Sequence, residues 1–335
     1  MPSKTAIQIA VLFATTFALP LAHAVGSCQI AASSAQDRYN EVMQPTCHNC
    51  YENEVARAMG AATMAQVLDK VKNIEIDFWD TRDAVFGGSA GQWFVRHNPG
   101  TIFQSGNDNI CSGNGKGTNN LAACLGDIKK WSDGHPNHPV ITIFLDKKQD
   151  WSSASAGRRP ADLDRLIDSH FGSKLFKPQM LQKNYASLRE AAQANAWPLM
   201  SELNGKIIVV LNGGQLMNHN KTQNAYLEER KQNASIFVGP DADESSDIFA
   251  TPNQFTASNA KQVVFYNLAA KEVGGKSYEL ANTMRGQRYV SRLWGGEAID
   301  MCTMRSNCVN NIALYKWNTS TCNGVDSGKL KFIGQ

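Results

Sequence analysis

Paired carboxylates and polar neighbours early in the chain have the spacing of a cation site. Glu75 and Asp77 alternate with apolar residues, so an extended strand would place both carboxylates on one face. Two adjacent carboxylates repel each other, and burying them would require a cation. His48 and Asn49 lie upstream of them, and Asn49 would add a carbonyl oxygen to the set. Hard divalent ions prefer such oxygen ligands, so the pattern predicts a divalent metal site.

Two further clusters lie at the ends of predicted strands. His97 follows a short apolar run and precedes the turn-forming residues 98–100. Asp146 and Lys148 end the apolar run 140–145, and the two-residue period of a strand places them on one face. One of the pair could bind the metal while the other neutralises a phosphate. In a barrel, the carboxyl ends of the strands form the catalytic face.

Each cluster also has an ordinary structural interpretation. A single histidine is more often structural than catalytic, and an E-x-D pair is usually a solvated strand face. Lys147 and Lys148 would then be an exposed pair. Cys47 and Cys50 around His48 are compatible with zinc or redox chemistry, although no second ligand pair has matching spacing. The catalytic interpretation is favoured because the three clusters appear in order at successive strand ends.

The elements expected around these clusters alternate between strands and helices. Strands are predicted at residues 74–78, 93–96, 140–145, 206–211, 235–238, 262–266 and 289–293, with a further one at 312–317. Helices are predicted at residues 54–72, 119–132, 161–171, 187–194 and 223–232. This alternation argues for a mainly parallel sheet. The continuous apolar run 207–211 is typical of a strand covered on both faces.

The predicted fold class is therefore α/β, an irregular TIM-type (β/α)8 barrel in a single domain stabilised by disulfides. The barrel is expected to be irregular because the connection 80–92 is short and glycine-rich, which leaves little room for a crossover helix.

The first 24 residues have the layout of a cleavable secretory signal. Lys4 precedes an apolar stretch, which ends in the small residues around His23. A membrane anchor is the alternative, but the apolar stretch is short and Pro20 interrupts it. We therefore expect a barrel domain at residues 25–335 in a secreted protein, either extracellular or periplasmic.

All eight cysteines lie beyond this segment, and an even number in an exported chain suggests disulfides. Their connectivity cannot be derived from the sequence. The short separations favour the pairs Cys111–Cys124 and Cys302–Cys308.

The charge balance excludes one class of partner. The 33 basic residues nearly match the 30 acidic ones, and a net charge of +3 does not indicate a nucleic-acid-binding protein. Peripheral contact with anionic membranes stays open, and the oligomeric state is not predicted.

Taken in order, the motifs resemble the X-region of calcium-dependent phosphoinositide phospholipases C, especially the smaller secreted microbial members. The first motif corresponds to His48-Asn49-Cys50-Tyr51, the second to Glu75-Ile76-Asp77, the third to His97 and the fourth to Asp146. The resemblance is clear over residues 46–148.

The resemblance implies a phosphodiesterase that acts on a phospholipid or another inositol phosphodiester. In such enzymes the inositol 2-hydroxyl attacks the phosphorus, the diacylglycerol oxygen leaves, and a cyclic phosphate forms. The implied cofactor is Ca²⁺, with ligands from Asn49, Glu75, Asp77 and Asp146.

Roles for the remaining groups follow from the resemblance and from their chemistry. Glu75 or Asp146 would accept the hydroxyl proton. His97 is the candidate general acid because an imidazole titrates near neutrality. His48 would hold the phosphoryl oxygens in the transition state, and Lys148 would add positive charge at the phosphate.

Two other functions remain compatible with these residues. A glycerophosphodiesterase or sphingomyelinase-D-like enzyme also combines a barrel, two histidines and an E-x-D pair, but such glycerophosphodiesterases usually carry arginine at the position of Asn49. A non-catalytic barrel that retains a relic of the site is the second alternative, and the fold does not exclude it.

Overall fold

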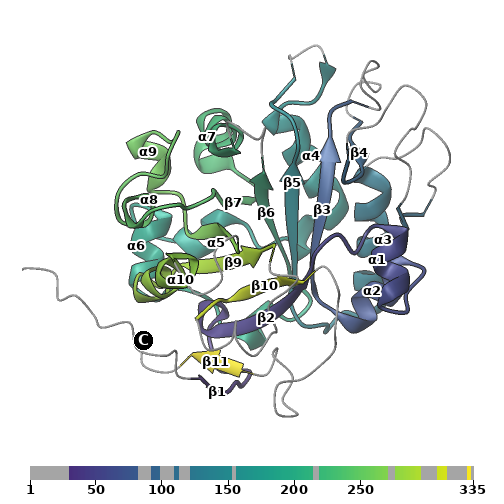
Figure 1. Ribbon diagram of the computed structural model, residues 1–335, viewed down its shortest axis with the longest axis horizontal. Coiled ribbons are helices and arrows are strands. Elements are labelled where there is room, and N and C mark those ends of the chain that lie inside the picture. Colours follow the sequence, from purple (N-terminus) through teal and green to yellow (C-terminus); the bar gives the residue numbers. More distant parts are fainter. Residues whose placement is uncertain are drawn as a thin grey trace, which may run out of the picture.

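The structure is a computed structural model, shown in Figure 1, and its fold is an α/β barrel. It describes residues 30–81, 92–98, 109–112, 121–152, 156–213, 219–270, 276–295, 308–314 and 330–332. The predicted signal at residues 1–24 lies outside the described residues.

Parallel strands form the barrel, in the order β7-β6-β5-β3-β2-β10-β9-β8. Their bounds are β2 (Val42–Cys47), β3 (Asn73–Trp79), β5 (Ile141–Lys147), β6 (Ile207–Gly213), β7 (Phe237–Val238), β8 (Phe265–Ala269), β9 (Val290–Trp294) and β10 (Asn311–Leu314). A parallel bridge between Asp241 and Asn267 joins the end of β7 to β8. The backbone bond from the N–H of Asn267 to the carbonyl of Pro240, at 2.9 Å, supports this nearly complete closure.

Helices surround the strands (Figure 1). They are α1 (Asn53–Ala58), α2 (Met64–Lys70), α3 (Leu121–Gly134), α4 (Pro160–Phe171), α5 (Pro178–Gln182), α6 (Leu188–Gln193), α7 (His219–Arg230), α8 (Ser245–Phe249), α9 (Ala257–Ala260) and α10 (Lys276–Gly286). Short 3₁₀ turns occur at η1 (Tyr39–Glu41), η3 (Gly172–Lys174), η4 (Met200–Leu203) and η5 (Lys231–Asn233). Several helices begin where the sequence supplies a cap; the Ser187 hydroxyl, for example, accepts from the backbone N–H of Glu190.

Two short strands extend the sheet below the barrel. β1 (Ile30–Ala32) pairs with β11 (Leu330–Phe332), and β11 pairs antiparallel with β2. Segments from near the two ends of the chain therefore lie side by side in Figure 1.

The predicted barrel is confirmed, but one of its strands was assigned to the wrong segment. The expected strand at 93–96 is β4 (Phe94–Val95), which pairs antiparallel with β3 at the barrel's edge. The short connection 80–92 leads to this return strand, so no crossover helix is needed. The barrel strand that the sequence did not reveal is β2, whose Pro45 and Gln44 interrupt any apolar run.

The expected helix at 54–72 is two helices, α1 and α2. Gly60, in the left-handed region with φ +70°, ends the first, and Thr63 caps the second by accepting from the N–H of Gln66. By contrast, β6 was expected to be a strand covered on both faces. This prediction is confirmed, because Ile207–Gly213 is buried at every position except its last.

Disulfides join Cys47 to Cys50 and Cys111 to Cys124. The second pair was predicted. The first means that the sulfurs around His48 do not hold zinc. Cys308 is also disulfide-bonded, while Cys302, its predicted partner, lies outside the described residues. Disulfides are typical of an oxidising compartment, as expected for an exported protein.

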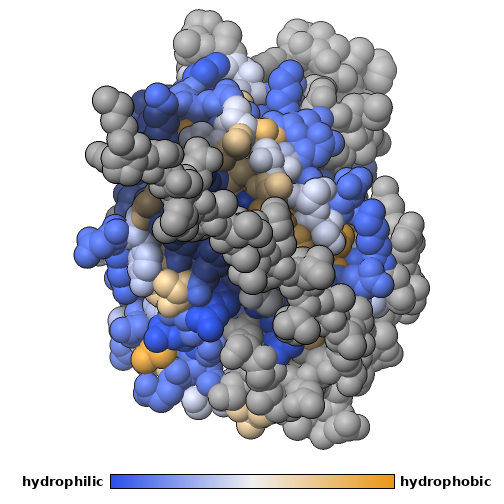
Figure 2. Space-filling view, turned by 90° about the vertical axis from the view of Figure 1, so that its left-hand side faces the viewer, coloured by the Kyte–Doolittle hydropathy of each residue, from blue (hydrophilic) through white to orange (hydrophobic). Residues whose placement is uncertain are grey.

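Figure 2 shows the side of the molecule where α6, α8, α9 and α10 lie. Hydrophilic residues dominate the coloured surface there, and hydrophobic ones appear in small groups. The large exposed hydrophobic side chains of the described residues are Met180, Tyr185 and Phe249. Within the part of the chain that is described, no helix has the length and hydrophobicity needed to cross a bilayer.

Candidate functional site

The turn that follows β2 presents the first two site residues. Cys47 ends the strand, and the disulfide to Cys50 encloses His48 and Asn49 between the two cysteines. Asn49 is fully buried and adopts a left-handed backbone with φ +57°. Its carbonyl accepts a 2.9 Å bond from the N–H of Glu52, which closes the turn before α1 begins.

Three carboxylates meet where β3 and β5 lie side by side. Glu75 and Asp77 alternate along β3, and Asp77 lies opposite Asp146 in the parallel register with β5. One oxygen from each of the three lies within 4.8 Å of the other two. Glu75 and Asp77 are 2% and 1% exposed, so the shared face predicted from the sequence is confirmed and is buried.

Oxygen atoms in this cluster lack hydrogen-bond partners among the described residues. They include Oδ1 of Asp77 and Oδ1 of Asp146. In the turn after β2, Oδ1 and Nδ2 of Asn49 also lack a partner among these residues. Buried polar atoms are almost always paired, so a set of buried oxygens without protein partners is suited to binding a cation. Carboxylate and amide oxygens are the donors that calcium takes, and these residues therefore fit that ion.

Lys148 lies beside the two aspartates of this cluster. Its Nζ lies 3.1 Å from Oδ2 of Asp77 and 2.9 Å from Oδ2 of Asp146. Burial acts to lower the pKa of Lys148, but Asp146, Asp77 and Glu75 outweigh burial and raise it above its ordinary value. The predicted proximity of Asp146 and Lys148 is confirmed.

The pKa of Asp77 rises well above its ordinary value. Burial is the largest cause, and the negative charges of Asp146 and Glu75 add to it, while Lys148 opposes them. Lys148 alone therefore does not offset the burial of Asp77 and the negative charges beside it. A divalent cation at the cluster would supply the balance.

Arg292, on β9, is a site residue that the sequence interpretation did not assign. Its Nη2 lies 2.8 Å from Oε1 of Glu75, while Nε2 of His48 lies 3.1 Å from Oε2. Its Nη1 donates to Oδ1 of Asn267 at 2.6 Å. Burial acts to raise the pKa of Glu75, but the charges of Arg292, His48 and Lys148 together lower it. The Arg292 guanidinium thus favours the ionised form of Glu75.

Asn212, at the end of β6, is a second residue that was missed. It lies opposite Asp146 in the β5–β6 register, is 2% exposed, and its Oδ1 has no partner among the described residues. The next residue, Gly213, has φ +76°, and a Cβ there would lie 1.6 Å from Oδ1 of Asp146. Only glycine leaves room for that carboxylate. A polar residue ending the apolar run at β6 was the available signal.

His97 follows β4, and the N–H of Arg96 just before it donates to the carbonyl of Asp77 at 3.3 Å. Its Nδ1 lies 3.8 Å from Oε1 of Glu52, and its side chain is 40% exposed. Burial, together with the charges of Lys148 and His48, lowers its pKa. The imidazole therefore lies within electrostatic reach of the cluster and is open to solvent, as a proton donor to a substrate must be.

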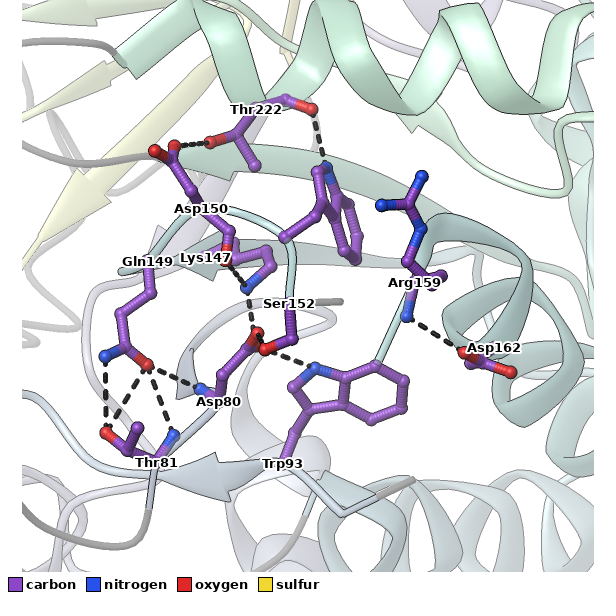
Figure 3. A network of polar contacts seen from close by, with 11 residues as sticks. Asp80, Thr81, Trp93, Lys147, Gln149, Asp150, Ser152, Arg159, Asp162 and Thr222 are labelled. Carbon is purple, nitrogen blue, oxygen red and sulfur yellow. Dashed lines mark hydrogen bonds and ion pairs between the residues drawn. The ribbon is translucent and has the colours of Figure 1, made fainter. Parts of the chain in front are cut away.

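The adjacent Lys147 has a different environment from Lys148, and the idea of an exposed lysine pair is wrong. Lys147 is fully buried, and its Nζ lies 2.6 Å from Oδ1 of Asp80, just after β3 (Figure 3). The indole N–H of Trp93 and the hydroxyl of Ser152 also donate to Asp80. This ion pair ties the carboxyl ends of β3 and β5 together on the opposite side from the cluster.

Aromatic rings and side-chain amides complete the same network. The Lys147 ammonium lies 4.9 Å from the ring centre of Trp151. Gln149 accepts from the backbone N–H of Asp80 at 2.8 Å and from that of Thr81 at 3.2 Å (Figure 3). Burial lowers the pKa of Lys147, although Asp80 opposes the shift. The network fixes the backbone that carries Asp146 and Lys148.

Comparison with known proteins places this geometry in a family. Residues 115–265 match the family described as phosphoinositide phospholipase C, Ca²⁺-dependent. The matched span includes Asp146 and Lys148. It does not include the earlier site residues, which are His48, Asn49, Glu75, Asp77 and His97. No curated protein sequence matches the chain.

Solved structures give a wider match. The chain is 35% identical to a calcium-dependent phosphoinositol-specific phospholipase C from the Gram-negative bacterium Pseudomonas sp. in its apo form. The match covers 90% of this chain and 97% of that chain, with a TM-score of 0.79. The myo-inositol complex of that enzyme matches at 36% identity, with the same coverage and TM-score.

A more distant structure shares the fold alone. It is a Ca²⁺-dependent phosphatidylinositol-specific phospholipase C from Streptomyces antibioticus, 19% identical, with a TM-score of 0.67 over 89% of this chain and 99% of that chain. With 35% identity to the Pseudomonas enzyme over nearly its whole length, the chain belongs to the calcium-dependent phosphoinositide phospholipases C, phosphoric diester hydrolases whose cofactor is calcium.

Proposed function

We propose that the protein cleaves the bond between glycerol and phosphate in a phosphoinositide, by attack of the inositol 2-hydroxyl, to give a cyclic phosphate and diacylglycerol. The observation that carries the proposal is the cluster of Glu75, Asp77 and Asp146 with oxygens within 4.8 Å, flanked by His48 and Lys148. The structural relative with myo-inositol bound supports an inositol substrate.

The metal ligands in this proposal are Asn49, Glu75, Asp77 and Asp146. Calcium held there would lower the pKa of a coordinated hydroxyl and offset negative charge on the phosphoryl oxygens. The unpaired oxygens of Asn49, Asp77 and Asp146 support this ligand set.

Glu75 is the proposed proton acceptor. Only an ionised carboxylate can take the hydroxyl proton, and the charge of Arg292 keeps Glu75 in that form by lowering its pKa. Asp146, whose Oδ1 has no partner among the described residues, is the alternative acceptor.

His48 and Lys148 are proposed to bind the phosphate. The 3.1 Å contact between Nε2 of His48 and Glu75 orients the His48 ring, and Lys148 faces the carboxylates that would neighbour a bound phosphate. Both would stabilise charge that builds on the phosphoryl oxygens in the transition state.

His97 is the proposed general acid for the departing diacylglycerol oxygen. Its lowered pKa makes its proton easier to transfer, and its partial exposure leaves room for a substrate. The environment that lowers the pKa also reduces the protonated fraction at neutral pH, so activity is expected to fall as the pH rises through that pKa.

The leader at residues 1–24 and the barrel domain at 25–335 complete the proposal. A secreted enzyme would meet its lipid at a membrane surface and contact that surface only peripherally. The large exposed hydrophobic side chains named above are compatible with peripheral contact.

A substrate panel tests the proposed function. Phosphatidylinositol, sphingomyelin and glycerophosphocholine would each be incubated with the protein, once with calcium and once with a calcium chelator. We expect cleavage of phosphatidylinositol alone, with release of diacylglycerol, and only with calcium. Cleavage of the other two substrates would favour a glycerophosphodiesterase or sphingomyelinase-D-like enzyme, and no cleavage of any substrate would favour the non-catalytic barrel.

A further inference from the structure

The turn after β2 combines two features that need a cause. Asn49 holds a left-handed backbone, a conformation that costs free energy for any residue other than glycine. Its side chain is fully buried, yet neither amide atom has a hydrogen-bond partner among the described residues. Hydrogen bonds within the described residues therefore do not set the direction of the Asn49 amide, and the backbone of the turn is left to do so together with packing.

The two ends of this turn are anchored by other parts of the fold. On one side, Cys47 pairs with Ile74 of β3 in the parallel register. On the other, the carbonyl of Tyr51 accepts from the N–H of Ile110 at 2.8 Å. Only His48, Asn49 and Cys50 lie between these anchors.

The Cys47–Cys50 disulfide spans that interval. The two Cα atoms are 5.5 Å apart, and both cysteines are fully buried. Their sulfurs lie 3.7 Å and 3.3 Å from Sδ of Met59, which follows α1. The bridge is therefore packed into the core and closes a ring that contains only two other residues, His48 and Asn49.

We propose that the Cys47–Cys50 disulfide is a positioning element of the active site, which holds the Asn49 amide and the His48 ring in place for calcium and phosphate. This inference rests on the proposed function, because it assumes that Asn49 is a calcium ligand. Its role differs from that of an ordinary stabilising disulfide, since a ring this small restricts the unfolded chain less than a large one does.

The Cys111–Cys124 disulfide provides a matched control. It joins residues 13 apart, whereas Cys47 and Cys50 are 3 apart, so its loss should release more unfolded-chain entropy. It encloses none of the proposed site residues. A purely structural role for both bridges thus predicts a greater stability loss from the Cys111–Cys124 bridge and no difference at the site.

The test compares the variants Cys47→Ala/Cys50→Ala and Cys111→Ala/Cys124→Ala with the wild type. For each protein, calorimetry gives the calcium dissociation constant, thermal unfolding without calcium gives the Tm, and a calcium titration gives the concentration for half-maximal hydrolysis of phosphatidylinositol. We expect the first variant to bind calcium about tenfold more weakly or worse, a 1.4 kcal/mol change, and to need correspondingly more calcium for hydrolysis. In the control, the calcium dissociation constant and the calcium concentration for half-maximal hydrolysis should both stay within about twofold of the wild type. Its Tm should nevertheless fall further than that of the Cys47→Ala/Cys50→Ala variant.

Calcium affinity equal to wild type in a folded Cys47→Ala/Cys50→Ala protein would overturn the inference, as would equal losses of affinity in both variants. If the alanine variant does not fold, Cys47→Val/Cys50→Ala refills part of the lost volume, and the same criteria apply to it. Failure of the wild type to bind calcium would instead overturn the proposed function, together with this inference.

Discussion

The ammonium of Lys148 lies 3.1 Å from Oδ2 of Asp77, a buried carboxylate whose other oxygen has no partner among the described residues. Lysine and calcium would therefore share one carboxylate. The two cations repel each other, while each is attracted to Asp77. Replacing Asp77 and replacing Lys148 should therefore change the calcium affinity in opposite directions.

Asp77→Asn should weaken calcium binding by about tenfold or more, because it removes one negative charge while keeping the shape of the side chain. Lys148→Met should instead strengthen calcium binding, because it removes a like charge, and should slow hydrolysis by removing charge near the phosphate. Calorimetry measures both affinities. Asp133→Asn, a change of an exposed carboxylate, is the control and should have no effect. Unchanged affinity in Asp77→Asn would show that the proposed ligand set is wrong.

His97→Ala and His48→Ala should both lose activity, but for different reasons. Loss of general acid catalysis should slow cleavage of phosphatidylinositol by a factor on the order of 10²–10⁴. A nitrophenyl ester of inositol phosphate has a good leaving group and needs little protonation, so it should partly rescue His97→Ala and not His48→Ala. Steady-state rates on both substrates measure this difference. Equal losses on both substrates would remove His97 as the acid.

Lys147→Met should destabilise the protein, because it leaves the carboxylate of Asp80 buried without its ion-pair partner. Breaking one side of a buried pair costs about 3–5 kcal/mol. Urea unfolding measures the loss, and the double variant Lys147→Met/Asp80→Asn should recover part of it, since the remaining amide can still accept from Trp93. Additive losses in the double variant would argue against a coupled pair.

The pH dependence of stability should carry a contribution from His138, far from the proposed chemistry. Its Nδ1–H donates to the carbonyl of Pro139 at 2.6 Å, so Nε2 accepts from the Ser132 hydroxyl at 2.7 Å. Burial is the main cause of its lowered pKa, the Pro139 bond opposes the shift, and the charges of Lys174 and Lys72 add to it. Protonation would place a positive charge in this buried setting, beside the charges of Lys174 and Lys72.

The sign of that contribution follows from the lowered pKa. Below the ordinary histidine pKa of about 6.5, the unfolded chain binds a proton that folded His138 does not, so the free energy of unfolding falls as the pH drops through this window. Above it, the contribution is constant. Urea unfolding measured at about pH 5.0 and about pH 7.5 checks this. The free energy of unfolding should fall more between the higher and the lower pH for the wild type than for His138→Gln. Equal losses would contradict the assignment.

The local pattern of residues predicted much of this fold. Alternating and continuous apolar runs located β3, β5 and β6, and these strands carry Glu75, Asp77 and Asp146. β2 was missed because its Pro45 breaks the usual strand signal, and its place in the barrel depends on pairing with β3, β10 and β11. α10 was missed as well. The position of β2 in the barrel depends on pairing with strands distant in the sequence, which the residues of a single segment do not reveal.

Much of the candidate site could be predicted because its members follow strand ends, where a short motif is visible. Arg292 gave no such signal, and for Asn212 the signal was a polar residue at the end of an apolar run, which was not used. Arg292 is on β9, which β2 and β10 separate from β3 in the strand order, and only the curved barrel brings its side chain to Glu75. Lys147 and Lys148 are adjacent in the sequence, and only the pleat of β5 and the packing of Asp80 distinguish their environments.

Phosphorus NMR of the reaction with phosphatidylinositol tests the central claim most directly. Attack by the neighbouring inositol hydroxyl joins two oxygens of one ring to the phosphorus, so the first product should show the distinct resonance of a five-membered cyclic phosphodiester. The account predicts that this resonance appears with calcium, before any acyclic inositol phosphate, and is absent with a chelator. Direct formation of an acyclic product, or equal rates with and without calcium, would contradict it.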